Sequence, residues 1–254
     1  MREWFFLYAS ADFALPMTRE GRRFLGFWIA AVVLGGMLAV AVQMNLLSPL
    51  YGLVMRLVTS PSINTLNWAY AVTDYVVVVV SAVAIAGPPA FVLGRRLVGI
   101  EVPWIIANAV AALVAAAIPL GSWLVDKTGY LSAAPPAGPS LVVIPLIYGV
   151  VGGCVTGVAQ AIVLKPYIRG VAWWIAATIF ARGMVNLVVS LMRWQIAGGG
   201  IQATTLTDIY GEEVVGALVG WLIFGIVTGL VLVRLLAERD PERPVDLAVQ
   251  ADLR

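Results

Sequence analysis

The chain has 254 residues, of which 61% are hydrophobic and 12% are charged, and its mean hydropathy is +0.94. A soluble globular domain has about 45–50% apolar and about 25% charged residues, so this composition excludes an ordinary soluble protein. The formal net charge is +2, histidine is absent, and Cys154 is the single cysteine. These counts exclude a disulfide framework, a histidine-ligated metal or haem, and Ser-His-Asp or Cys-His catalysis.

Six apolar stretches are close to the ~20 residues that a helix needs to cross a bilayer. They lie at approximately 24–45, 68–93, 102–124, 140–164, 171–192 and 213–236. A helix satisfies its own backbone hydrogen bonds in lipid, so continuous apolar runs favour helices here. The sequence therefore predicts an all-α, polytopic membrane protein with six transmembrane helices in one domain, residues 24–236.

Three flanking segments are less apolar. Residues 1–23 combine a short aromatic run with arginines, which predicts an interfacial amphipathic segment on the cytoplasmic leaflet, with a disordered tail as the alternative. The segment 46–67 is expected to form a short interfacial helix on the outer surface. Residues 237–254 are polar and contain Pro241 and Pro244, which predicts a solvated tail.

Orientation follows from the basic residues. Most arginines and lysines fall on the side of the two termini, and only Arg56, Lys127 and Arg193 fall on the other. The positive-inside rule then places both termini in the cytoplasm of a multi-pass protein of the cell (plasma or inner) membrane.

A pattern W-I-x-A opens each odd-numbered stretch, at Trp28, Trp104 and Trp174. Two of the three even-numbered stretches share G-x-V-T-G, at Gly153–Gly157 and Gly225–Gly229, and residues 83–87 of the other are a weaker echo. These recurrences predict three pseudo-repeated α-hairpins, approximately 24–93, 102–164 and 171–236, all inserted with the same polarity. Recurrence through composition alone is the alternative. The tryptophans are expected to be interfacial anchors in the cytoplasmic headgroup belt.

Glycines spaced four residues apart lie on one face of a helix and let another backbone approach closely. Two spans carry such stripes, and we expect them to be helix-packing positions: Gly149, Gly153, Gly157, Gly216, Gly220, Gly225 and Gly229. Packing within one chain is favoured, and packing between protomers remains open. Asn108 and Gln160 are expected to be interhelical hydrogen-bond partners.

Charged residues inside the spans are the clearest functional signal. Arg182 lies at the middle of the fifth span, Asp74 lies well inside the second, and Asn186 follows Arg182 by one turn. One interpretation is a polar cavity that binds an ion, a proton or a polar headgroup. The other is a buried ion pair that only fixes helix packing.

No motif indicates catalysis, a metal or nucleotide binding, so we expect a non-catalytic protein without a cofactor. The favoured interpretation is a permease-like protein or a membrane subunit of a larger complex. A purely structural or assembly role is the alternative, and a membrane-embedded enzyme is the least favoured. The expected partner is the lipid bilayer, with other membrane subunits or a second copy of the chain left open, and no nucleic acid is expected.

Overall fold

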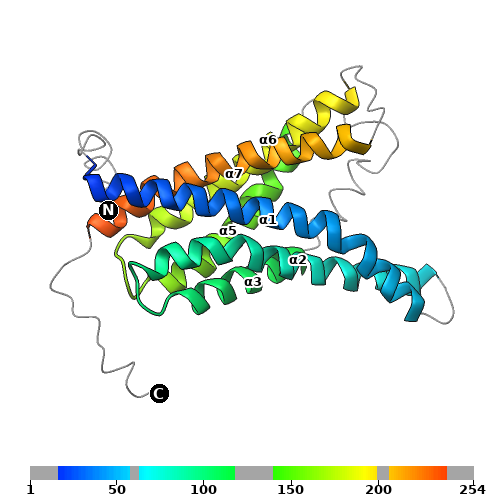
Figure 1. The fold of residues 1–254 in the computed structure, drawn as a ribbon, viewed down its shortest axis with the longest axis horizontal. Helices are drawn as coiled ribbons and strands as arrows, with labels where there is room; N and C mark the ends of the chain where they lie inside the picture. The colour runs from blue at the N-terminus through cyan, green and yellow to red at the C-terminus, as the bar shows by residue number, and fades with distance from the viewer. Residues whose placement is uncertain (1–16, 58–62, 118–139, 199–205, 239–254) are drawn as a thin grey trace, which may run out of the picture.

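The computed structural model describes residues 17–57, 63–117, 140–198 and 206–238. All elements in these ranges are helices (Figure 1): α1 (Arg19–Leu57), α2 (Ile63–Gly94), α3 (Glu101–Ala117), α5 (Ser140–Leu164), α6 (Val171–Gly198) and α7 (Leu206–Ala237). The prediction of an all-helical fold is confirmed for this part of the chain. Most of the predicted interfacial segment 1–23 and of the predicted tail 237–254 lies outside the described residues.

Five of the described helices are long and apolar enough to cross a membrane, and α3 adds a 17-residue apolar helix. Many of their large apolar side chains point away from the molecule, for example Phe91 at 62% exposed and Ile162 at 69%. Exposed apolar surface on this scale requires an apolar surrounding. The helices are therefore compatible with an integral membrane protein.

One predicted element has different bounds. The structure continues α1 through Pro49 to Leu57, and α2 begins at Ile63, so the short separate helix expected at 46–67 is wrong. A proline removes one backbone hydrogen bond, but its fixed φ matches that of a helix. Pro88, Pro89 and Pro145 likewise lie inside helices α2 and α5.

The six described helices form a closed ring. Each helix contacts its neighbours along the chain, and α7 contacts α1 to close the circle. Figure 1 shows that α1 begins and α7 ends at the same end of the bundle. A ring of this kind has an inner surface that all its helices share.

The end of the ring where α1 begins carries most of the described cations, and we call it the basic end. Its turns join α2 to α3 and α5 to α6, and each contains a glycine with positive φ, 79° at Gly99 and 74° at Gly170. Only glycine adopts this conformation at no steric cost. The salt bridge Arg96–Glu20, at 3.6 Å, links the α2–α3 turn to α1.

The glycine stripe of α5 lies against α6. A Cβ added to Gly149 would lie 2.6 Å from the carbonyl oxygen of Arg182, and one added to Gly153 would lie 2.7 Å from the Cα of Ile179. At Gly157 the nearest atom is the Cα of Ile175, at 3.2 Å. Side chains at the first two positions would therefore force the two backbones apart.

The glycines of α7 face two different helices. Gly216 and Gly220 lie against α6, and Gly225 and Gly229 lie against α1. All seven predicted helix-packing glycines thus lie at contacts within one chain. These contacts hold the α5–α6, α6–α7 and α1–α7 sides of the ring together.

Candidate functional site: the central cavity

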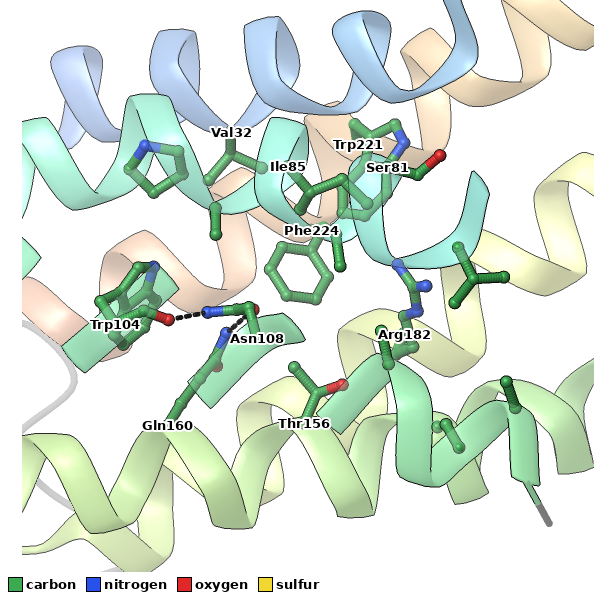
Figure 2. A pocket seen from close by; sticks show the side chains of 18 of the residues that line it. Val32, Ser81, Ile85, Trp104, Asn108, Thr156, Gln160, Arg182, Trp221 and Phe224 are labelled. Atoms are coloured by element: carbon green, nitrogen blue, oxygen red, sulfur yellow. Dashed lines mark hydrogen bonds between the residues drawn. The ribbon is translucent and has the colours of Figure 1, made fainter. Parts of the chain in front are cut away.

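A cavity of about 310 Å³ lies inside the ring, and all six described helices contribute to its wall. Most of the lining is apolar, and its polar side chains are Gln43, Ser81, Asn108, Thr156, Gln160 and Arg182. Figure 2 shows several of these polar side chains pointing into the space between the helices. The volume is at the lower end of the range of about 300–1,000 Å³ for small-molecule sites.

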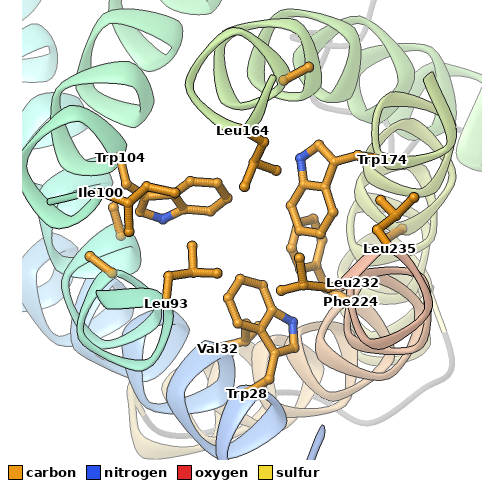
Figure 3. Packing of buried hydrophobic residues seen from close by; sticks show 14 of the residues in the cluster. Trp28, Val32, Leu93, Ile100, Trp104, Leu164, Trp174, Phe224, Leu232 and Leu235 are labelled. Carbon is orange, nitrogen blue, oxygen red and sulfur yellow. The ribbon is translucent and has the colours of Figure 1, made fainter. Parts of the chain in front are cut away.

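Three tryptophans close the cavity toward the basic end, and we call them the tryptophan floor (Figure 3). Trp28, Trp104 and Trp174 are 1%, 2% and 0% exposed. Their ring centroids lie 5.9, 6.0 and 6.2 Å apart, and each pair meets edge to face. This differs from the predicted place in a headgroup belt. Aromatic pairs in this geometry gain about 0.5–1.5 kcal/mol beyond their buried area, which favours the centre of the ring.

Above the floor, the three helices that carry its tryptophans bear residues of different sizes. Positions eight residues after each tryptophan lie on the same helix face. They hold Gly36, Ala112 and Arg182. A Cβ on Gly36 would collide with the ring of Trp221, and Ala112 lines the cavity. Trp221 therefore fills the place beside Gly36, whereas Ala112 leaves room on the axis and Arg182 extends into it, so the space is asymmetric.

Arg182 extends from the middle of α6 into this space, with its guanidinium carbon 5.0 Å from the centre of the Trp221 ring (Figure 2). Among the described residues, no carboxylate forms an ion pair with Arg182. An arginine at the centre of a membrane helix costs about 2.5–3.5 kcal/mol. A cation–π contact returns about 0.5–2 kcal/mol. The positive charge is therefore only partly compensated by the described residues.

The structure does not bring Asp74 to Arg182. Gly35 on α1 lies against Ile85 on α2, and the adjacent Gly36 packs against Trp221. Because Arg182 contacts Trp221, it lies at about the same height along the bundle as Ile85. Asp74 lies three turns, about 16 Å, farther along α2. It is exposed. Helix register thus separates two charges that the predicted span boundaries place within reach of each other.

Asn186, the third residue of the predicted polar site, is half-buried and does not line the cavity. Trp221, Ser81 and Thr156 do line it, and sequence reasoning missed them. A tryptophan, a serine or a threonine in an apolar helix carries no distinctive signal. The available clue was Arg182 itself, because an intramembrane cation needs neighbouring groups that tolerate it.

A chain of hydrogen bonds crosses one side of the cavity wall. The indole Nε1–H of Trp174 donates to Gln160 Oε1 at 3.0 Å, and Gln160 Nε2 donates to Asn108 Oδ1 at 2.9 Å. Asn108 Nδ2 then donates to the carbonyl of Trp104 at 2.8 Å (Figure 2). The predicted interhelical role of Asn108 and Gln160 is confirmed, and the chain ties α6, α5 and α3 together.

Two buried polar groups of the lining have no hydrogen-bond partner among the described residues. Ser81 is 4% exposed, and its hydroxyl has no hydrogen-bond partner among the described residues. The indole nitrogen of Trp104 has none in that part of the chain either, whereas that of Trp28 donates to Thr228 Oγ1 at 3.1 Å. Buried polar groups without partners are uncommon in proteins and call for an explanation.

No protein-family model, no curated protein and no solved structure matches this chain. The functional argument therefore rests on the geometry of the cavity.

Proposed function

We propose that the chain is a cell-membrane protein that crosses the bilayer six times, with both termini in the cytoplasm. The concentration of arginines at the basic end supports this orientation. We further propose that three α-hairpins, approximately 24–93, 102–164 and 171–236, surround a common axis. The nearly equal spacing of Trp28, Trp104 and Trp174 supports that arrangement.

We propose that the protein is a permease-like carrier that binds a small solute in the central cavity. One observation carries this proposal: Arg182 directs a positive charge, without a carboxylate partner in the described residues, into a cavity shared by all six helices. A purely structural arginine would be expected to pair with a buried carboxylate. An unpaired one is suited to meeting a charged or polar solute.

The tryptophan floor is the barrier in this proposal. It separates the cavity from the basic end, and all three of its indoles come from different helices. A solute therefore passes only when the hairpins move apart at that level. Rocking of hairpins about a fixed central site is how repeat-built carriers alternate access.

The assembly role receives less support. In that role, glycine stripes on the lipid-facing surface would contact a partner protein. Gly149, Gly153, Gly216 and Gly229 instead all lie against helices of the same chain. The alternative interpretation of Asp74 and Arg182 as a packing ion pair also loses its basis, because helix register keeps them apart.

Cysteine accessibility tests the permease role. In a Cys154→Ala background, Ala112→Cys places a thiol in the cavity wall, and Val110→Cys places one on the outer face of α3, where Val110 is 50% exposed. Oriented vesicles are treated with a small, charged, membrane-impermeant methanethiosulfonate. A carrier alternates between its two sides, so we expect Ala112→Cys to be modified from both and Val110→Cys to resist from both.

Modification of Ala112→Cys from one side only would reduce the cavity to a blind pocket and contradict transport. The absence of modification from either side would mean that the cavity is dry and closed, which contradicts the proposal as a whole.

A further inference from the structure

The charged group of the cavity wall and its buried groups without a partner among the described residues can donate hydrogen bonds, while Gln43 and Thr156, which also line the cavity, can both donate and accept. The guanidinium of Arg182 has five N–H donors and no acceptor, and an indole is a donor only, as at Trp104. The hydroxyl of Ser81 can also donate. The amide oxygens of Asn108 and Gln160 already accept hydrogen bonds within the wall. A ligand that matches these groups must supply acceptors.

The charge of the lining is equally one-sided. Its described residues include Arg182 and no aspartate or glutamate. A single positive charge matches a single negative charge. Around it the wall is formed by Val78, Ile85, Phe224 and the tryptophan floor, which offer apolar contact to the rest of a ligand.

Polar groups lie at both ends of the cavity, with Asn108 and Gln160 beside Trp104 and with Arg182 and Ser81 at the other end. In Figure 2, Arg182 and Ser81 lie on the side of Trp221, whereas Trp104 lies at the far side beyond Phe224. The guanidinium carbon lies 5.0 Å from the centre of the Trp221 ring, and its N–H groups donate no hydrogen bond to a described residue, so they are available for a planar, bidentate acceptor. A carboxylate has that geometry.

We propose that the cavity binds a small organic monocarboxylate. Its carboxylate accepts hydrogen bonds from the guanidinium of Arg182 and the hydroxyl of Ser81, and its apolar body packs against Phe224 above the tryptophan floor. This inference rests on the proposed function, because it names the substrate class of the same site. No covalent step is involved, and recognition requires only charge, shape and desolvation.

Two other anions share part of this chemistry. Inorganic phosphate carries more charge than one arginine compensates and has no apolar surface. The phosphodiester of a lipid headgroup is also a monoanion that pairs with arginine. The experiment therefore includes both, alongside a neutral analogue of the carboxylate.

Equilibrium dialysis of radiolabelled benzoate against the purified full chain in detergent measures the binding. We expect saturable binding at one site, displaced by butyrate but not by the neutral isostere benzamide, by inorganic phosphate or by phosphatidylglycerol. Arg182→Gln should weaken benzoate binding about tenfold or more, since it removes a bidentate charged pair. Arg182→Lys keeps the charge and should be intermediate, and the exposed Arg23→Gln should bind as the wild type does.

A second variant guards against misfolding of Arg182→Gln. Ala112→Leu keeps the arginine and fills the cavity with an apolar side chain, so it should abolish benzoate binding while the protein remains monodisperse on gel filtration. Binding that survives Ala112→Leu would place benzoate elsewhere and overturn the proposal.

Three further outcomes would also overturn it. Equal binding of benzoate and benzamide would show that the charge of the ligand does not contribute to binding. Displacement by phosphate as strong as that by butyrate would show that the apolar part of the ligand does not contribute. Displacement by phosphatidylglycerol that is lost in Arg182→Gln would make a lipid headgroup the occupant.

If carboxylate selectivity fails while Ala112→Cys is modified from both sides, the substrate class is wrong and the permease role stands. If binding is selective while Ala112→Cys is modified from one side only, the ligand class stands and the permease role is wrong.

Discussion

The indoles of the tryptophan floor are alike in burial and spacing but differ in hydrogen bonding. Trp28 donates to Thr228 and Trp174 donates to Gln160, in each case on the helix that packs beside it. The indole N–H of Trp104 has no acceptor within the described residues. Two indoles of the floor are therefore hydrogen-bonded to its wall and one is not, although the same residue type occupies all three positions.

This difference predicts unequal effects of the same substitution. Changing any one of the three tryptophans to phenylalanine removes a similar apolar area, but only Trp28→Phe and Trp174→Phe also break a hydrogen bond and leave Thr228 Oγ1 or Gln160 Oε1 without its donor. We expect these two to lose about 1 kcal/mol more of the free energy of unfolding than Trp104→Phe, a typical interhelical hydrogen bond in a membrane protein. Reversible unfolding in mixed detergent micelles measures this difference. Equal losses in all three would contradict it.

At the level of whole helices, close backbone approach between α5 and α6 sets the position of Arg182. Gly149 and Gly153 lie directly against its backbone and Cβ, so α5 packs closely beside this residue, whose side chain reaches the cavity. The glycine stripe is thus a packing feature with a functional consequence. It positions the charge of Arg182 at the cavity.

Two adjacent glycines of α5 offer a matched test of this packing. A Cβ at Gly153 would lie 2.7 Å from the Cα of Ile179, whereas one at Gly152 would meet nothing within 4 Å. Gly153→Ala should lower the free energy of unfolding by about 1–3 kcal/mol, as overpacked cores do. Gly152→Ala should leave it unchanged or raise it by up to about 1 kcal/mol, because alanine favours the helix.

Thermal unfolding in detergent, followed by tryptophan fluorescence, compares these two variants. A Gly153→Ala protein as stable as Gly152→Ala would mean that the backbones of α5 and α6 leave room for a methyl group where they cross.

For the molecule as a whole, large apolar side chains lie both inside the ring, as in the tryptophan floor, and on its outer surface, while a few small hydroxyl side chains are buried inside. Thr73, Thr178 and Thr228 are fully buried, while Phe27 and Val98 are 61% and 69% exposed. This distribution is stable only if lipid surrounds the helices, because water would make it unfavourable by roughly 25 cal/mol for each exposed Å².

The basic end is the basis for the orientation that we propose, and a fusion experiment measures that orientation. Alkaline phosphatase at the carboxyl end should be inactive, and green fluorescent protein there should be fluorescent, because the positive-inside rule keeps that end in the cytoplasm. Alkaline phosphatase inserted between α6 and α7 should be active, which serves as the control. An active phosphatase at the carboxyl end would reverse the proposed topology.

Composition and periodicity alone predicted much of the fold. Lipid leaves a backbone no partners except its own, so long apolar runs had to be helices, and residues 140–164 and 171–192 closely match α5 and α6. Spacing of four identified the glycines that lie at helix contacts, and the cost of an intramembrane charge singled out Arg182. These are local properties of a helix, and a sequence displays them directly.

Ring closure, the burial of the tryptophans and the separation of Asp74 from Arg182 were decided only in three dimensions. Each depends on how far a helix is rotated about its axis and shifted along it relative to its neighbours. Those quantities come from contacts between helices distant in the chain, such as α1 with α7. A tryptophan near a helix end suits either a headgroup belt or a shared axis, and only the closing of the ring placed Trp28, Trp104 and Trp174 together.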